Sequence, residues 1–384
     1  MTSLFRLPGE VRFGPGVSRF VSDDLQRLAA SRVMIVSDPG IVAAGLLDPI
    51  EADLLDHGYT TSTFTGVTPN PRDFQCIAAA SAMNDFGADV VLAVGGGSPI
   101  DLAKAAIGIA TNGGRPQDWI APRTFPRPPL PMVAIPTTAG TGSEVTRSSV
   151  INDTERAIKI SLRDNQIAPR FAIVDPDLTL SLPPSLTAAT GMDALTHAIE
   201  AYTGKSATPV TDALALHAIR MIATHLKTAV ADGSNRQARE GMMMASVIAG
   251  IAFSNSDVAA VHCIAEAIGG RYDTPHGVAN SLFLPYLFAF NAESNHQRHA
   301  DVAVAMGVAA QDDSPASAAR KGAQALTDLG RDIGIPALKQ VPGIKQDDFP
   351  WIAATSRENL SNESNARTMT EADYLSILDQ AWNA

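Results

Sequence analysis

Residues 90–101, VVLAVGGGSPID, decide the fold of the first part of the chain. The apolar run 90–94 has the character of a buried strand, and the three glycines that follow allow the backbone to approach an anion closely. The next residues open an expected helix, whose N-terminus offers free N–H groups, and Pro99 suits a first helical turn. The stretch predicts a strand, a phosphate-binding turn and a helix, although such a turn also forms without a ligand. Its spacing is not the G-x-G-x-x-G pattern of the common dinucleotide fingerprint.

Similar apolar runs recur on both sides of this stretch and alternate with longer amphipathic segments. Because strands buried on both faces read as continuous apolar runs, this rhythm predicts a parallel sheet covered by helices on both faces. Residues 147–162, with a polar centre at 152–155, read instead as a hairpin. The expected strands are 33–36, 90–94, 132–135 and 171–174, and the expected helices are 41–57, 73–87 and 99–112.

The pattern changes near residue 180. After residues 182–185 (LPPS), apolar residues follow the i, i+3, i+4 spacing of helices, with long examples at 209–230 and 236–252. A chain of 384 residues is also longer than one ordinary core requires. We therefore expect an α/β domain at 1–180 and an all-helical domain at 181–384.

Composition narrows the classes of function. Hydrophobic residues make up 45% of the chain and charged residues 18%, as in a folded protein rather than a disordered one. The formal net charge of −11 disfavours nucleic acid and anionic membranes as partners. The two cysteines form no disulfide framework, and we recognise neither a signal peptide nor an apolar run long enough to span a bilayer. We expect a cytoplasmic protein.

A second loop, residues 136–144 (PTTAGTGSE), also follows an expected strand and is rich in hydroxyl groups and glycine. Such a loop can hold a ribose or a phosphate, and together with the glycines at 95–97 it suggests a dinucleotide. Asp38, at the end of the strand 33–36, could accept a hydrogen bond from the ribose and repel a 2′-phosphate, which favours NAD over NADP. Asp38 fits equally well as a turn residue before Pro39 and Gly40.

Four residues in the second half have the character of one metal-ligand set. Asp193 and His197 are four positions apart, so on a helix their side chains project from one face. His262 lies in an expected helix that runs into a Gly-Gly break, after which a turn could return His276. One carboxylate and three imidazoles suit Fe(II), Zn(II) or a similar divalent ion. Spacing alone leaves open that Asp193 and His197 are a simple helix pair and that the other two are ordinary histidines.

Four motifs, in order along the chain, carry a resemblance to a known family. They are residues 95–101 (GGGSPID), 136–144 (PTTAGTGSE), 191–202 (GMDALTHAIEAY) and 269–280 (GGRYDTPHGVAN). Together they resemble the iron-containing (group III) alcohol dehydrogenase family, nearly end to end. The resemblance implies an N-terminal dinucleotide-binding α/β domain and a C-terminal helical, metal-binding domain, an architecture shared with dehydroquinate synthase, with the active site between them. It also implies a homodimer or larger homo-oligomer.

The resemblance assigns roles to individual residues. Asp193, His197, His262 and His276 would hold the metal, usually Fe(II) in this family. The implied reaction is hydride transfer between NAD and a primary or small secondary alcohol or its carbonyl product, with the metal acting on the substrate oxygen. For Lys159, a dinucleotide contact and a solvated strand residue are equally good interpretations. The positions that match the family's dinucleotide contacts are Asp38, Asn70, Gly95, Gly96, Gly97, Ser98, Asp101, Thr137, Thr138, Thr146 and Lys159.

The chain departs from the family pattern near the expected metal. Many members have a second histidine four residues after the third ligand, where this chain has Glu266. Our hypothesis is that Glu266 replaces this histidine as a proton acceptor; an additional metal ligand and a hydrogen-bonding support are the alternatives. Asp257 also departs from the pattern, since a small residue is common at its place in the family. With Asp193, Glu266 and Asp257 near one pocket, we expect neutral or cationic alcohols and aldehydes to be preferred over anionic ones.

Other classes of function stay open at this point. A specialised carbonyl reductase, or a lyase like dehydroquinate synthase, would use NAD on the same architecture. The lyase needs clustered lysines and arginines for a phosphorylated, carboxylated substrate, and residues 190–290 carry no such cluster. A non-haem Fe(II) oxygenase uses two histidines and one carboxylate, so the fourth ligand and the dinucleotide loops count against it. A ligand sensor would not need the metal set.

Overall fold

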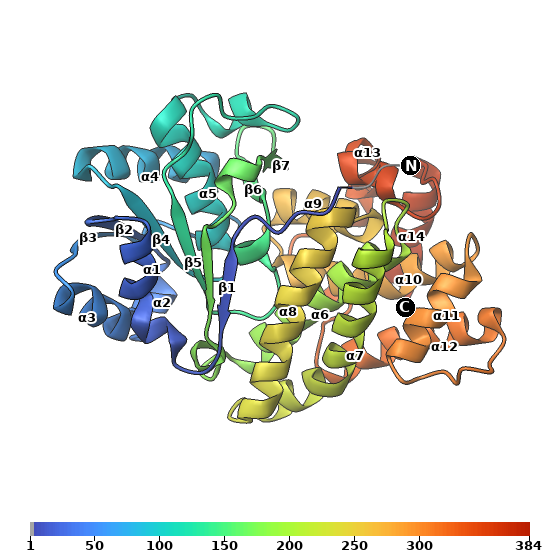
Figure 1. Cartoon of the computed structure of the whole chain (residues 1–384). Helices are drawn as coiled ribbons and strands as arrows, with labels where there is room; N and C mark the ends of the chain where they lie inside the picture. Colours follow the sequence, from blue (N-terminus) through green and yellow to red (C-terminus); the bar gives the residue numbers. More distant parts are fainter. Residues whose placement is uncertain (1–3) are drawn as a thin grey trace. The chain divides into compact units, whose positions relative to one another are not determined.

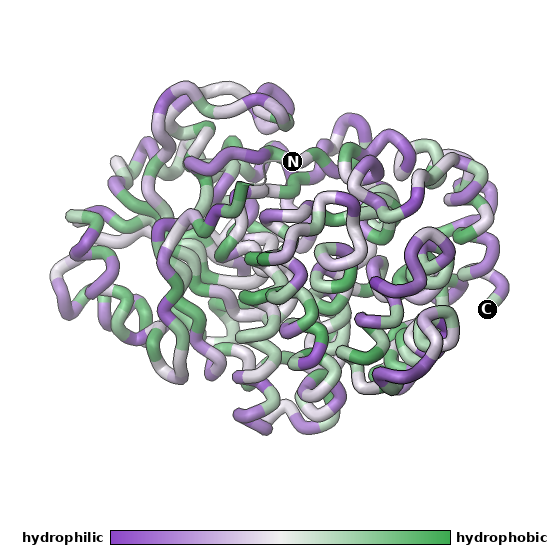
Figure 2. The backbone as a smooth tube through the Cα atoms, turned by 45° about the vertical axis from the view of Figure 1, so that its right-hand side comes forward, coloured by the Kyte–Doolittle hydropathy of each residue, from purple (hydrophilic) through white to green (hydrophobic). Residues whose placement is uncertain are grey.

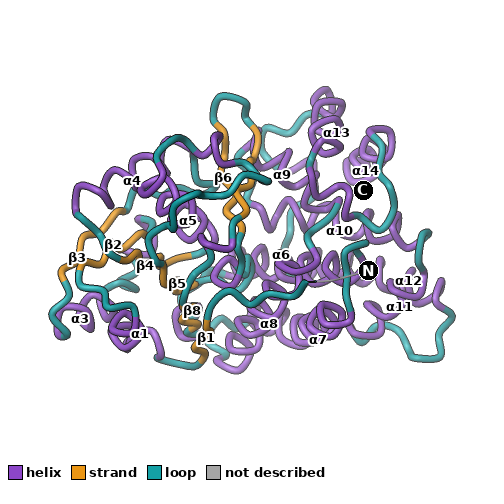
Figure 3. Tube along the Cα trace, turned by 45° about the horizontal axis from the view of Figure 1, so that its top comes forward, coloured by secondary structure: helices purple, strands orange, loops and turns teal. Residues whose placement is uncertain are grey.

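The computed structural model describes residues 4–384, which divide into two compact units. One unit is Leu7–Ser181, and the other is Leu182–Ala384 together with residues 4–6. Among the described residues, strands occur in the first unit, and the second is built of helices and loops (Figure 3). The expected fold class, an α/β part followed by an all-helical part, is confirmed.

The first unit is organised by a six-stranded sheet in the order β1-β8-β5-β4-β2-β3, with every neighbouring pair parallel. The two edge strands, β1 and β3, were not predicted, because their half-exposed residues do not form an apolar run. The strands are β1 (Glu10–Phe13), β2 (Arg32–Val36), β3 (Thr60–Phe64), β4 (Val90–Gly95), β5 (Met132–Pro136) and β8 (Phe171–Val174).

Helices cover both faces of this sheet (Figure 1). Successive side chains of a strand point to opposite faces, so Met34 and Val36 enter one core while Val33 and Ile35 enter the other. The first core is closed by α4 (Asp73–Phe86) and α5 (Gly97–Asn112), and the second by α1 (Val21–Arg27) and α3 (Asp48–Asp56). This two-sided burial explains the continuous apolar runs of the central strands.

Two local features complete the first unit. The expected hairpin is present as β6 (Ser148–Asp153) and β7 (Ile158–Arg163), which pair antiparallel. The helix expected at 41–57 is divided into α2 (Pro39–Ala43) and α3, because the chain turns at Gly45, where φ is +68°.

The second unit is a bundle in which α6 packs against α7, α8 and α10. Figure 2 shows hydrophobic segments, in green, along the inner helices and hydrophilic segments, in purple, at outer turns. No single helix within residues 4–384 is long and apolar enough to cross a membrane, although α8 and α9, taken as one pair bent by 101°, meet the same criteria of length and composition. The helices are α6 (Pro184–Thr203), α7 (Pro209–Ala231), α8 (Arg236–Ser256), α9 (Ala260–Tyr272), α10 (His276–Ala292), α11 (His296–Ala305), α12 (Pro315–Asp332), α13 (Phe349–Glu358) and α14 (Glu371–Asn383).

Candidate metal and cofactor sites

Helix α6 carries three polar side chains on one face: Asp193, His197 and Glu200. Their spacing of four and then three residues places them in one row along the helix. All three are buried, with at most 5% of any of them exposed. Because buried charges are costly without partners, this row requires complementary groups on the neighbouring helices.

Those groups come from the starts of α9 and α10. Asp193, His262 and His276 each bring one ligand atom to within 4.8 Å of the other two. The Oδ1 atom of Asp193 lies 4.0 Å from Nε2 of His262 and 3.7 Å from Nε2 of His276. Separations of this size suit atoms that share one cation through bonds of about 2.0–2.2 Å, so the donor set fits a divalent metal.

The backbone that supports these histidines differs from the sequence expectation in two ways. Helix α9 does not break at its Gly-Gly pair but continues to Tyr272 and ends at Asp273, where φ is +59°. His276 does not lie on a turn; it is the first residue of α10. Both imidazoles are therefore held by the first turn of a helix, and Asp273 in the left-handed conformation, rather than glycine, makes the connection.

His197, the fourth expected ligand, lies beside this group of three. Its ring stacks on that of His262, with 4.5 Å between centroids, and on that of Phe253, with 4.1 Å between centroids. His197 thus adjoins His262, but its ligand atom is not among the three that converge. Its role as fourth ligand stays a prediction.

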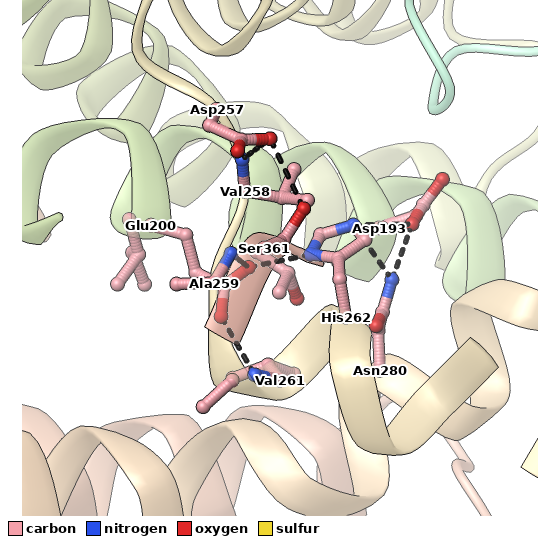
Figure 4. A network of polar contacts seen from close by, with 12 residues as sticks. Asp193, Glu200, Asp257, Val258, Ala259, Val261, His262, Asn280 and Ser361 are labelled. Atoms are coloured by element: carbon pink, nitrogen blue, oxygen red, sulfur yellow. Dashed lines mark hydrogen bonds and ion pairs between the residues drawn. The ribbon is translucent and has the colours of Figure 1, made fainter. Parts of the chain in front are cut away.

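Glu200 supports the site, a role that was not predicted from the sequence. Its carboxylate accepts a hydrogen bond from Nδ1 of His262 at 2.5 Å and from the backbone N–H groups of Ala259 and Val261 at 2.7 Å each (Figure 4). Holding Nδ1–H in this way fixes the tautomer that leaves Nε2 of His262 free to ligate. The signal was present in the sequence, since Glu200 follows Asp193 by seven residues, two turns along the same face.

The same contact sets the charge preference of His262. Burial by itself lowers the pKa of this imidazole, but the adjacent Glu200 carboxylate, aided by Asp193, outweighs burial and raises the pKa above its ordinary value. The Glu200 carboxylate at Nδ1 therefore increases the basicity of Nε2, the atom of His262 that faces Asp193.

Asn280 is a second unassigned member of the site. It lies one turn after His276 on α10 and is fully buried. Its amide Nδ2 donates to Oδ1 of Asp193 at 2.7 Å and lies 3.2 Å from Nε2 of His262 (Figure 4). The same nitrogen lies 3.3 Å from Nε2 of His276. Its spacing of four residues from His276 is the helical signal that could have drawn attention to it.

The two acidic residues that depart from the family pattern, Glu266 and Asp257, lie outside the converging set of Asp193, His262 and His276. Glu266 lies one turn beyond His262, and its carboxylate accepts a hydrogen bond from Nδ2 of Asn359 at 2.6 Å. Asp257, whose φ is +67°, accepts hydrogen bonds from the hydroxyls of Ser361 and Ser364 at 3.1 Å and 3.0 Å. Neutral donors thus hold both side chains, and the role of Glu266 in proton transfer stays a prediction.

In the first unit, several of the expected dinucleotide residues lie at the carboxyl edge of the six-stranded sheet, whereas Lys159 lies on β7 of the hairpin. From the adjacent strands β2 and β4 the chain proceeds toward opposite sides of the sheet, which is the topological switch point where parallel α/β sheets bind ligands. Asp38 follows β2, Gly95 ends β4, and Thr137 follows β5. The N–H of Thr137 donates to the carbonyl of Gly95 at 3.0 Å, so the two loops adjoin.

The glycines of the turn permit this close contact. A Cβ on Gly97 would lie 2.7 Å from the side chain of Thr141, and one on Gly96 would lie 3.2 Å from Thr138. The turn role of Asp38 is confirmed, and its contact with a ribose stays a prediction. Its Oδ1 caps α2 by accepting from the N–H groups of residues 40 and 41, while its Oδ2 lies on the side of Gly95. A glycine cradle beside a carboxylate oxygen fits an adenosine ribose and its phosphates.

Asp101 and Thr146 participate in an internal network around Lys104, a residue that was not predicted to matter from the sequence. Lys104 is fully buried, and its Nζ donates to Ser143, Thr146 and the carbonyl of Ser148 at 2.8–2.9 Å. Burial lowers the pKa of Lys104 to about 8, and burial raises the pKa of Asp101, which accepts from Ser143 and from a backbone N–H. This network braces the second loop, and direct cofactor contacts by Asp101 and Thr146 stay predictions.

Comparison with known proteins identifies the family. The model of the iron-containing alcohol dehydrogenase family matches residues 8–176, and the model of the C-terminal part of the Fe-containing alcohol dehydrogenase family matches residues 187–382. The chain belongs to the iron-containing alcohol dehydrogenase family. It is therefore an oxidoreductase of alcohols and aldehydes, as the resemblance implied.

Relatives of this alcohol dehydrogenase cover it almost completely. It is 41% identical to a 1,3-propanediol dehydrogenase of Klebsiella pneumoniae over 381 residues, 98% of each chain. It is 38% identical to an NAD-dependent methanol dehydrogenase of Bacillus methanolicus, over 99% of this chain and all of that one. A crystal structure of a 1,3-propanediol oxidoreductase superposes with a TM-score of 0.96 at 40% identity, covering 99% of this chain and 100% of the other.

Changing Glu200 to Gln tests the support of His262. The amide can still accept hydrogen bonds, but it lacks the charge that fixes the imidazole tautomer and raises ligand basicity. We expect the dissociation constant for Zn(II), measured by competition with a chromophoric chelator, to rise by about 10–100-fold. An unchanged dissociation constant in a folded variant would show that Glu200 only caps α9.

Proposed function

We propose that this alcohol dehydrogenase binds Fe(II), or another divalent metal in its place, through Asp193, His197, His262 and His276, and uses NAD as its hydride carrier. The observation that carries the proposal is the convergence of Asp193, His262 and His276 within 4.8 Å, with the Glu200 carboxylate fixing the first of these histidines. The glycine turn at 95–97 and Asp38 support the NAD assignment.

Each part of the chain then has a defined task. A bound cation supplies a Lewis acid for the substrate oxygen, and NAD supplies the hydride acceptor. Glu200 keeps Nε2 of His262 in the ligating tautomer, and the backbone around 95–98 holds the phosphates at the start of α5. Glu266, one turn beyond His262, accepts the proton of the alcohol through water, and Asn359 orients its carboxylate.

Charge in the helical unit favours particular substrates. Asp193, Glu200, Asp257 and Glu266 are four carboxylates that occupy α6, α9 and the turn before α9. Glu266 accepts a hydrogen bond from the amide of Asn359, and Asp257 accepts hydrogen bonds from the hydroxyls of Ser361 and Ser364. We infer a preference for neutral or cationic primary alcohols and small secondary alcohols over carboxylates, sulfonates and phosphates.

We also propose that the protein is a homodimer and that it lies in the cytoplasm. Both cysteines, Cys76 and Cys263, are free and buried, as suits a reducing compartment. Sedimentation equilibrium and cell fractionation test these two statements separately from the chemistry.

The first test is anaerobic NAD⁺ reduction by metal-stripped protein that has been reloaded with Fe(II), Zn(II) or Mn(II). We expect reloading to restore NADH formation, with 1-butanol and 4-amino-1-butanol giving a kcat/KM about tenfold or more above that of 4-hydroxybutyrate. These substrates have the same four-carbon chain and differ in terminal charge. Preference for the acid would refute the charge argument, and silence with every metal would refute the metal assignment.

Glu266→Gln tests the proton acceptor. The amide keeps the size and can still accept from Asn359, but it cannot take up a proton. We expect kcat to fall by about 10²–10⁴-fold, with the metal content and the KM for NAD⁺ unchanged. The matched control is Asn359→Ala, which removes the orienting contact and should lower kcat less. Full turnover of Glu266→Gln at every pH would exclude the relay.

Asp38→Gly tests cofactor choice. Removing the carboxylate eliminates the repulsion of a 2′-phosphate, so the ratio of kcat/KM with NADP⁺ to that with NAD⁺ should rise by about tenfold or more. Because Oδ1 of Asp38 also caps α2, Asp38→Ser serves as the control that retains a cap without charge. An unchanged ratio in both variants would mean that another residue discriminates between the two cofactors.

A further inference from the structure

The amide nitrogen of Asn280 contacts all three of the converging ligand atoms. It lies 2.7 Å from Oδ1 of Asp193, 3.2 Å from Nε2 of His262 and 3.3 Å from Nε2 of His276. An amide nitrogen carries two hydrogens and donates only, so it is a centre of partial positive charge directed at three acceptors. Asn280 is fully buried, and its Oδ1 has no hydrogen-bond partner among the described residues. The contacts of this side chain are therefore those made by its nitrogen at the ligand set.

Each lone pair on these acceptor atoms can bind one partner at a time, either a hydrogen-bond donor or a cation. A neutral imidazole that carries its hydrogen on Nδ1 has a single lone pair on Nε2, and the Nδ1–H of His262 is held by Glu200. That lone pair either accepts a hydrogen bond from Asn280 or binds a cation. A metal held by Asp193, His262 and His276 must displace the amide from the two histidines.

We propose that Asn280 competes with the metal, and that this competition stabilises the metal-free protein and limits metal affinity. The inference rests on the proposed function, because it takes the same residues as ligands. Without a metal, Asn280 supplies a donor to the buried Asp193 carboxylate, which would otherwise be costly to keep in the interior. The ligand set stays assembled, and the metal stays exchangeable.

Asn280→Leu tests the competition, because leucine has nearly the shape of asparagine and no donor. The metal-free variant loses a donor that the metal-loaded variant does not need. We expect the metal-free variant to unfold at a lower temperature than metal-free wild type, and its dissociation constant for Mn(II), from calorimetric titration, to fall about tenfold. Asn280→Ala gives the same contrast if the leucine variant does not fold.

Asn291→Leu is the matched control. Asn291 is buried on the same helix, and its side chain exchanges hydrogen bonds with Asn365 rather than with the three ligand atoms. This variant should unfold at a lower temperature with and without metal, and its Mn(II) dissociation constant should stay at the wild-type value.

The outcomes separate the two hypotheses. Weaker Mn(II) binding by Asn280→Leu, or equal loss of thermal stability with and without metal, overturns the competition and makes Asn280 a support for the ligands. Wild-type protein that binds neither Mn(II) nor Zn(II) overturns the metal assignment itself, and the inference with it.

Discussion

One buried carboxylate connects the helices of the candidate metal site. Glu200 is 3% exposed, and it receives three hydrogen bonds from the stretch 259–262. A carboxylate in the interior is costly unless donors surround it, so these donors and Glu200 must stay together for the helical unit to fold. The start of α9 is thereby fixed against α6, and His262 is carried to Asp193. The chemistry of the site depends on this packing constraint.

The α/β unit uses a buried cation in a comparable way. Lys104 on α5 is fully enclosed and holds the second loop through Ser143 and Thr146. The glycine turn at the start of the same helix packs against that loop, and its glycines leave no side chain in the way. In each unit, a charged group that must find partners inside the protein positions a backbone segment beside a ligand site.

The departures of this chain from the family pattern cluster in one place. Asp257 and Glu266 lie on either side of His262, and both are held by side chains from the segment 359–364. Asp257 also adopts a left-handed backbone that favours glycine, which costs stability unless its contacts compensate. The hydrogen bonds from the hydroxyls of Ser361 and Ser364 provide that compensation. A segment about 100 residues away in sequence thus holds both acidic side chains on either side of His262.

The sequence alone determined the fold class, the central strands, the glycine turn and the identity of the family, because each depends on local periodicity or on contiguous motifs. It also placed Asp193 and His197 on one helical face. Only the tertiary structure decided that α9 runs through its Gly-Gly pair, that His276 begins a helix, and that Glu200 and Asn280 meet the same imidazole. Their partners lie 18 to 87 residues away along the chain, and such contacts are set by how helices pack, which no local spacing encodes. Asp38 shows most directly the difference between what the sequence determines and what only the tertiary structure decides. Its sequence position allowed two roles, and the structure shows one of them, with Oδ1 capping α2 while Oδ2 lies on the side of Gly95.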